Sequence, residues 1–199
     1  MPTKSHNGYE YFVTWVDDKS HKVFIARMHE KSEVTQHLKA FISWAEVKIG
    51  QNVGTLHSDR GGKYIAGEAQ HYLEEKGIKH KMTMPHTPQH NGVAKCMNWT
   101  LLDKVQAMLI NADLPQLYWY DALLYATHIH NVTPMQALDN IIPEEAWSGN
   151  KPNISNLRTF GVCAFVHIPE SHRNNISKNQ LFLFHLIPSY YILFLLFWG

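Results

Sequence analysis

Apolar and polar positions along the chain follow two patterns, one typical of strands and one typical of helices. The strand-like pattern comes first. β-Branched and aromatic residues crowd Tyr9–Val16 and Lys22–Met28, with a polar segment between them, so we expect a β-hairpin. Shorter apolar runs predict three further strands, at Thr55–Ser58, Ile78–Met82 and Leu157–Ile168.

Helical spacing fills the intervals between these strands. Met84–Asn91 contains two prolines and is expected to be a loop, and Gly77 is placed to end the helix before it. We expect helices at Ser32–Lys48, Ala66–Lys76, Gly92–Asn111 and from Leu114-Pro115 to about His130. Strands alternating with helices in this order predict an α/β sheet covered by helices on both faces.

Composition limits the number of domains and the class of protein, but it does not indicate a function. A chain of 199 residues with 45% hydrophobic residues suits one domain, or one domain with an appendage. The net charge of +1 gives no support to a protein that grips DNA phosphates. Cys96 and Cys163 are too few and too far apart for a zinc finger or a disulfide framework, and two free thiols fit a reducing compartment. The N-terminus lacks the apolar region of a secretory signal.

The C-terminal end differs from the rest. Leu181–Trp198 is the most apolar run and has no formal charge, although His185 and Pro188 interrupt it. A membrane span needs about 20 apolar residues, so a tail anchor is one interpretation; the flanking Arg173 and Lys178 would then lie in the cytoplasm. A second interpretation is that the run is translated from outside the original reading frame. A third is that it adds a strand to the sheet.

Two blocks of residues carry the most specific signal. One reads HSDRGGKY from His57, and the other reads TPQHNGVA from Thr87. At this separation they resemble the catalytic core of Copia-type LTR-retrotransposon integrases, a DDE, RNase H-like family. The resemblance covers about residues 1–170.

The resemblance implies a fold of the RNase H-like, retroviral integrase type: an α/β protein with a mixed sheet flanked by helices. In that family the first strand is central, pairs with the second and fourth, and carries the first catalytic Asp. This sequence begins after it, with Met1-Pro2-Thr3 resembling the end of the segment that follows it. We therefore expect a sheet lacking its central strand and a marginal fold, since each backbone group buried without a partner costs about 1–3 kcal/mol.

The resemblance also implies a site for Mg²⁺ or Mn²⁺ built from three carboxylates. Asp59 stands at the position of one catalytic metal ligand. The family's Glu should fall 36 positions later, where the chain has Lys95. A protonated lysine does not ligate Mg²⁺, would repel the ion and would pair with Asp59. Cys96 and Trp99 replace two basic residues of the family, so we expect that the metal is not bound and that catalysis is lost.

Other candidate residues also have simpler structural interpretations. By resemblance the nucleic-acid-binding residues are Arg60, Lys63, Lys79, Lys81, Gln89 and Asn91; the alternative is ordinary solvated charge. Asp17 and Asp18 are interpreted as turn carboxylates. Glu68, Glu74 and Glu75 are interpreted as solvated helix residues. The histidines near the motif (His57, His71, His80, His86, His90) are interpreted as surface or loop residues rather than a zinc site. Tyr118, Trp119, Tyr120 and Tyr125 are expected in the core.

The sequence thus predicts three regions: a partial integrase core at 1–132, an extension with a strand at 133–170, and a hydrophobic tail at 171–199. The leading hypothesis is an integrase remnant that is inactive in strand transfer. Two alternatives stay open, a non-catalytic nucleic-acid-binding or interaction protein and a tail-anchored fragment. Resemblance implies DNA as the partner and the nucleus as the compartment. It leaves open whether the chain forms a homo-oligomer. A membrane would be a further partner only if residues 181–198 insert into it.

Overall fold

The computed structural model describes residues 3–58, 67–82, 88–167, 179–186 and 192–195, with the backbone alone for 88–93 and from residue 163 onward. The chain divides into two units. Unit 1 comprises Met1–Asp18 and Val23–Thr100, and unit 2 comprises Lys19–Lys22 and Leu101–Gly199.

Unit 1 begins with the predicted hairpin. Strand β1 (Tyr11–Val16) pairs antiparallel with β2 (Val23–Met28), with Tyr11 opposite Met28 and Val16 opposite Val23. A 3-10 turn, η1 (Lys31–Glu33), then leads into α1 (Val34–Ile49), which ends at Gly50 in the left-handed conformation. Glycine adopts that conformation without the steric cost of a side chain, so the helix ends here.

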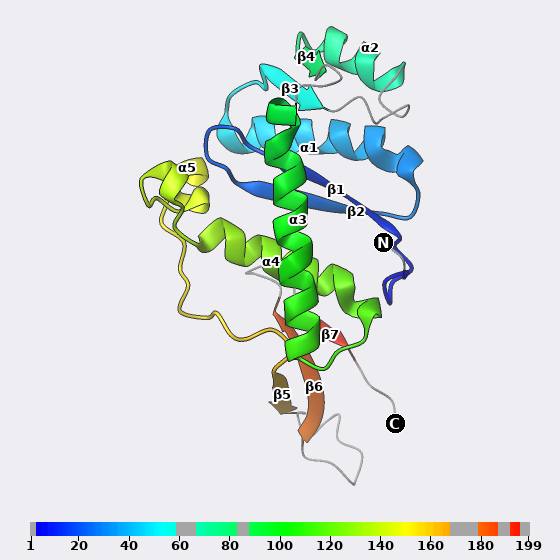
Figure 1. Ribbon diagram of the computed structural model, residues 1–199, viewed down its shortest axis with the longest axis vertical. Coiled ribbons are helices and arrows are strands. Elements are labelled where there is room, and N and C mark those ends of the chain that lie inside the picture. Colours follow the sequence, from blue (N-terminus) through cyan, green and yellow to red (C-terminus); the bar gives the residue numbers. More distant parts are fainter. Residues whose placement is uncertain (1–2, 59–66, 83–87, 168–178, 187–191, 196–199) are drawn as a thin grey trace. The chain divides into compact units, whose positions relative to one another are not determined.

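Helix α1 is the element around which unit 1 packs (Figure 1). Towards the hairpin, Trp15 stacks on Phe41 with ring centroids 4.6 Å apart, and Phe24 contacts the same ring. Its other contacts form an apolar core with the elements that follow. That core contains Leu38, Ile42, Ala69, Leu73 and Ile78, with Trp15, Val53, Leu56 and Tyr72 packed against it.

The second strand pair is parallel. Strand β3 (Thr55–Ser58) and β4 (Lys79–Met82) pair in register, with Thr55 opposite Lys79, and α2 (Glu68–Glu75) lies between them in the sequence. Gly77, at a φ of 69°, turns the chain after α2, as predicted.

The strand pairs of unit 1 agree with the predicted sheet that lacks its central strand. Within the described residues, β1–β2 and β3–β4 form separate two-stranded sheets that share the core under α1, and no strand joins them. In the family's fold the first strand lies between the counterparts of β1 and β3.

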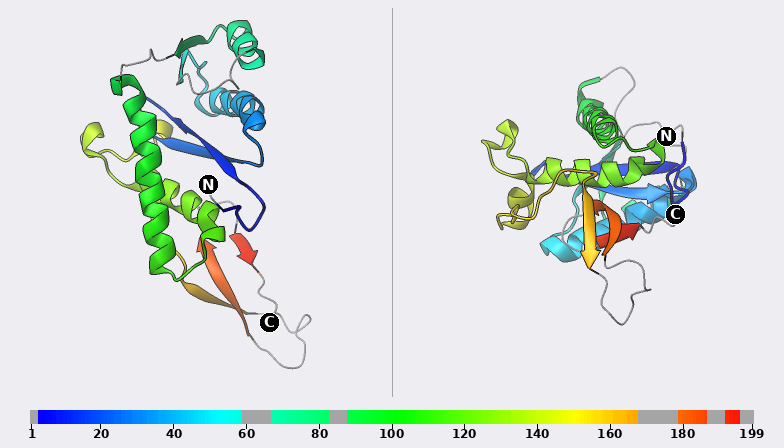
Figure 2. Two further views of the ribbon diagram at one scale, coloured as in Figure 1. Left: turned by 45° about the vertical axis from the view of Figure 1, so that its right-hand side comes forward. Right: turned by 90° about the horizontal axis from the view of Figure 1, so that it is seen from below.

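Helix α3 (Pro88–Asn111) is continuous from unit 1 into unit 2 (Figure 2). The predicted loop over 84–91 is therefore wrong for its last residues, because the helix begins at Pro88. Proline is favoured in the first helical position, where its missing N–H has no partner to lose.

Unit 2 is mainly helical before its sheet. After α3 come η2 (Gln116–Tyr118), α4 (Trp119–Val132), η3 (Gln136–Leu138) and α5 (Pro143–Ser148), a short helix that the sequence did not predict. Tyr118, Trp119, Tyr120 and Tyr125 are all buried, which confirms their assignment to the core. The Tyr125 hydroxyl donates a hydrogen bond to the carbonyl of Arg158.

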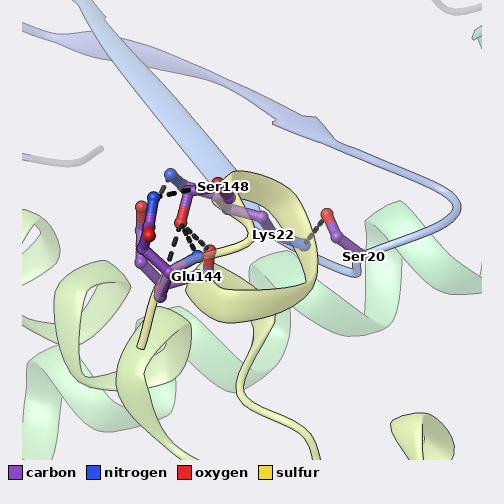
Figure 3. Close-up of polar contacts among 5 residues, drawn as sticks. Ser20, Lys22, Glu144 and Ser148 are labelled. Atoms are coloured by element: carbon purple, nitrogen blue, oxygen red, sulfur yellow. Dashed lines mark hydrogen bonds and ion pairs between the residues drawn. The ribbon is translucent and has the colours of Figure 1, made fainter. Parts of the chain in front are cut away.

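Residues 19–22 of the hairpin turn belong to unit 2. Lys22 Nζ lies 2.6 Å from Glu144 Oε2 of α5 (Figure 3), with only 12% of the lysine side chain exposed. The Ser20 hydroxyl is buried and accepts a hydrogen bond from the Lys22 N–H. His130 of α4 lies 3.3 Å from the carbonyl oxygen of His21. Side chains of α4 and α5 thus hold this turn.

The C-terminal residues form a separate sheet. Strand β5 (Cys163–His167) pairs antiparallel with β6 (Asn179–Leu186), which pairs with β7 (Ile192–Leu195). The predicted strand over 157–168 begins late, because Phe160 and Gly161 form a turn with Gly161 at a φ of 79°. Of the three interpretations of the tail, the one in which it adds a strand to the core sheet is wrong for the described residues, because β6 and β7 extend β5 instead. Among the described residues, no helix is both long and apolar enough to span a bilayer.

Candidate metal and nucleic-acid site

The ends of β3 and β4 define the candidate site. These strands are parallel, so their carboxyl ends meet at one edge, with Ser58 opposite Met82. Asp59 follows Ser58 directly in the sequence, but it lies outside the described residues, as do Arg60 and Lys63. Their predicted roles as metal and nucleic-acid ligands stay predictions.

Three elements converge on the last residue before Asp59. The Ser58 hydroxyl of β3 lies 2.8 Å from Nε2 of His80 on β4, and His80 Nδ1 lies 2.9 Å from Oε1 of Gln70 on α2. All three side chains are partly buried. Because an amide oxygen only accepts, Nδ1 carries the proton and Nε2 accepts from the serine. The chain Ser58–His80–Gln70 therefore ties the carboxyl end of β3 to β4 and α2.

The sequence did not single out Ser58 or Gln70. With His80 they come from three elements, and no local pattern indicates that the three side chains meet. The interpretation of His80 as an ordinary surface histidine is wrong, since it lies inside this chain of hydrogen bonds. His57 and His71 are exposed, as predicted, and the side chains of His86 and His90 lie outside the described part.

A basic face lies on the other side of β4. Side chains alternate along a strand, so Lys79 and Lys81 point away from the side that His80 occupies, and both are exposed. His57, also exposed, is opposite Lys81 in the register. Gln89 and Asn91 lie in the first turn of α3, and their side chains are not among those described.

Lys95 lies about two turns into α3, and its side chain is exposed. Cys96 and Trp99, the two other departures from the family pattern, are exposed on the same helix. Because Asp59 lies outside the described residues, the predicted pairing of Lys95 with Asp59 stays a prediction.

The remaining carboxylates lie where solvated helix and turn residues are expected. Glu68 pairs with Lys39 of α1 at 2.6 Å, and Glu74 accepts a hydrogen bond from the Gln70 amide. Glu75 is exposed, as is Asp18 in the hairpin turn. Within the described residues, no three His, Cys, Asp or Glu side chains come close enough to hold a metal ion.

Comparison with known proteins places these features in a family. Residues 1–88 match the family described as Integrase core domain. The chain is 37% identical over 181 residues to the retrovirus-related Pol polyprotein from transposon TNT 1-94 of Nicotiana tabacum, covering 91% of this chain and 14% of that protein. It is 30% identical over 164 residues to the Pol polyprotein from transposon RE1 of Arabidopsis thaliana, covering 82% and 11%. The chain thus spans about one seventh or less of these relatives.

The fold has a counterpart among solved structures. A chain of the simian T-cell lymphotropic virus intasome, solved in complex with PP2A regulatory subunit B56 gamma, superimposes with a TM-score of 0.57. The match covers 91% of this chain and 65% of that chain at 19% identity, which establishes likeness of fold alone. The family match, the Pol relatives and the two sequence blocks assign the chain to the integrase core domains of Copia-type retrotransposons.

Proposed function

We propose that this chain is an integrase-derived domain that does not catalyse DNA strand transfer. The observation that carries the proposal is Lys95, an exposed cation 36 positions after Asp59, where the family has a metal-binding Glu.

The donor set does not fit the family's divalent metal. Two-metal catalysis of phosphoryl transfer uses two ions about 4 Å apart, one at the attacking and one at the leaving oxygen. Mg²⁺ and Mn²⁺ are hard ions that prefer carboxylate oxygens, and carboxylates from separate elements hold them. A lysine at one of these positions offers three N–H donors, no acceptor and a positive charge. Asp59 is then left without its partner on α3.

The test is an assay of DNA nicking and strand transfer with purified protein and Mg²⁺ or Mn²⁺. The integrase region of the tobacco relative serves as the positive control and Asp59→Asn as the matched negative control. We expect the unaltered chain and Asp59→Asn to give the same background. Activity in the unaltered chain that disappears in Asp59→Asn would refute the proposal.

A second candidate function is non-catalytic binding of nucleic acid, with the nucleus as the compartment. The exposed Lys79 and Lys81 on one face of β4 favour it, because phosphate binding needs accessible cations rather than metal ligands. Each phosphate contact on duplex DNA contributes about 0.9 to the slope of log affinity against log salt.

The double variant Lys79→Ala/Lys81→Ala should therefore weaken DNA binding and reduce that slope by about 2. Lys151→Ala, which removes an exposed lysine in unit 2, is the matched control. An unchanged slope in the double variant would remove β4 from the binding surface.

A further inference from the structure

The hairpin turn of unit 2 contains a residue in a strained conformation. His21 has a φ of 54°, in the left-handed region that residues other than glycine rarely adopt. A residue keeps such a conformation only where its surroundings hold it there. The carbonyl oxygen of His21 lies 3.3 Å from Nε2 of His130 on α4, and the His130 side chain is buried. A buried titratable group thus holds the strained residue.

The next residue of the turn, Lys22, is held by α5 (Figure 3). Its ammonium group pairs with the Glu144 carboxylate and lies 5.7 Å from the centroid of the Trp147 ring. A cation over the face of an aromatic ring is attracted to it. Glu144 is itself fixed, because its carbonyl accepts a hydrogen bond of 2.7 Å from the Ser148 hydroxyl. The turn is therefore attached to both α4 and α5.

The two histidines of α4 add positive charge to this region at low pH. Burial lowers the pKa of both His128 and His130, so both are neutral near pH 7. A protonated His130 would be a buried cation within the field of Lys104 on α3. A protonated His128 would interact with the Glu144 carboxylate and compete for it with Lys22. Acid thus weakens both attachments of the turn.

No neighbouring group can compensate for these two charges. A fall in pH adds positive charge or removes negative charge at every titratable group, so it supplies no new anion. This holds for the other titratable groups on α4, on the turn and on the elements that pack against α4. They are Asp121 on α4, His21 in the turn, Tyr118 on η2, Glu145 on α5 and His185 on β6, whose side chain is not among those described.

We propose that the turn Lys19–Lys22 is a latch released by acid, in which protonation of His130 and His128 detaches it from α4 and α5 while the helices stay folded. Release exposes the His130 cation to water and lets His21 leave its left-handed conformation. Opening a four-residue turn exposes far less surface than unfolding unit 2, so it occurs more readily. The latch is independent of the metal site and of the basic face of β4.

Hydrogen exchange of the full chain at pH 7.5 and pH 5.0 tests the latch. Mass spectrometry follows peptides from the turn and from α4, after correction for the intrinsic effect of pH on amide exchange. A histidine whose pKa returns to about 6.5 on opening favours the open state by up to about thirtyfold at pH 5. We expect the protection of the turn to fall by about five- to thirtyfold, and that of α4 to change much less.

Three variants identify the groups responsible. His130→Gln keeps an N–H donor near the His21 carbonyl but takes no charge, so it should remove most of the pH dependence. His71→Gln replaces an exposed histidine of α2 and is the matched control, with the pH dependence of the unaltered chain. Lys22→Gln removes the ion pair with Glu144 and should lower the protection of the turn at both pH values.

Equal protection of the turn at pH 7.5 and pH 5.0 would overturn the proposal. So would an equal loss of protection in α4, because the turn would then not open separately. The same pH dependence in His130→Gln as in the unaltered chain would also overturn it. Lys22→Gln leaves α4 unaltered and provides an independent test where His130→Gln does not fold. Unchanged protection in that variant would show that the ion pair does not hold the turn.

Discussion

Gly149 and Gly161 both adopt positive φ, at 73° and 79°, but they have different surroundings. A Cβ added to Gly149, which ends α5, would meet no atom within 4 Å. A Cβ on Gly161 would lie 2.3 Å from Cβ of Ala112, which is far inside contact distance.

We therefore predict that the two alanine substitutions differ in cost. Gly149→Ala should lower the free energy of unfolding by about 1–2 kcal/mol, the cost of a left-handed L-residue. Gly161→Ala should lower it by a further 1–3 kcal/mol or so, because the overlap with Ala112 forces the backbone to shift. Urea unfolding of both variants measures the difference, and equal losses would contradict the geometry.

His130 is a second residue with a measurable consequence. It is buried on α4, and its Nε2–H donates to the His21 carbonyl. Burial lowers the pKa of His130, the charge of Lys104 lowers it further, and the hydrogen bond to His21 opposes the shift. Burial also lowers the pKa of the neighbouring His128.

Because its pKa is lowered in the folded chain, His130 makes stability depend on pH. The unfolded chain binds the proton near the ordinary value of about 6.5, and the folded chain binds it only at lower pH. The contribution of His130 to the free energy of unfolding is therefore fully present above about pH 6.5, and it falls as the pH drops below that value. We predict that the urea midpoint decreases from pH 7.5 to pH 5 and decreases less in His130→Gln. Parallel pH curves for the two proteins would show that His130 is not responsible.

The sequence could assign individual residues to family positions where their spacing along the chain is enough to do so. The interval between Asp59 and Lys95 identifies both the family position and the departure from it. The hydrogen-bonded chain Ser58–His80–Gln70 was not predictable, because it depends on how three elements meet.

At the scale of elements, this chain of hydrogen bonds links β3, β4 and α2. Gln70 Oε1 is the acceptor that holds the proton of His80 on Nδ1. We predict that His80 is the Nδ1–H tautomer near neutral pH in the unaltered chain. Gln70→Ala should mix the tautomers and lower the free energy of unfolding by about 1 kcal/mol.

Nitrogen-15 NMR of the imidazole resonances distinguishes the tautomers. Gln36→Ala, which removes an exposed glutamine of α1, is the matched control and should leave the proton on Nδ1. An Nε2–H tautomer in the unaltered chain would contradict the proposed direction of the hydrogen bonds.

Element boundaries were predictable in proportion to the strength of their local signals. Strand β3 occupies the predicted residues Thr55–Ser58, and β1 and β2 differ from prediction by one or two residues at their starts. Periodicity did not reveal α5, since six residues give too short a pattern. The start of α3 was misplaced because Pro88 signals both a loop and a first helical turn.

At the scale of the whole molecule, the fold class was predictable and part of the strand pairing was not. The separation of β1–β2 from β3–β4 follows from the family's strand order. The apolar tail offered no cue to its partner, because strand pairing is set by distant residues. It pairs with β5, in a sheet apart from the other two.

The central claim is that Lys95 removes the metal site of an integrase core. A Mn²⁺ titration followed by electron paramagnetic resonance tests it most directly, on the unaltered chain, Lys95→Glu and Asp59→Asn. We predict that the unaltered chain and Asp59→Asn show the same background binding of Mn²⁺. Lys95→Glu should bind Mn²⁺ more tightly than both of them. One equivalent of Mn²⁺ bound by the unaltered chain as tightly as by Lys95→Glu, and lost in Asp59→Asn, would contradict the claim.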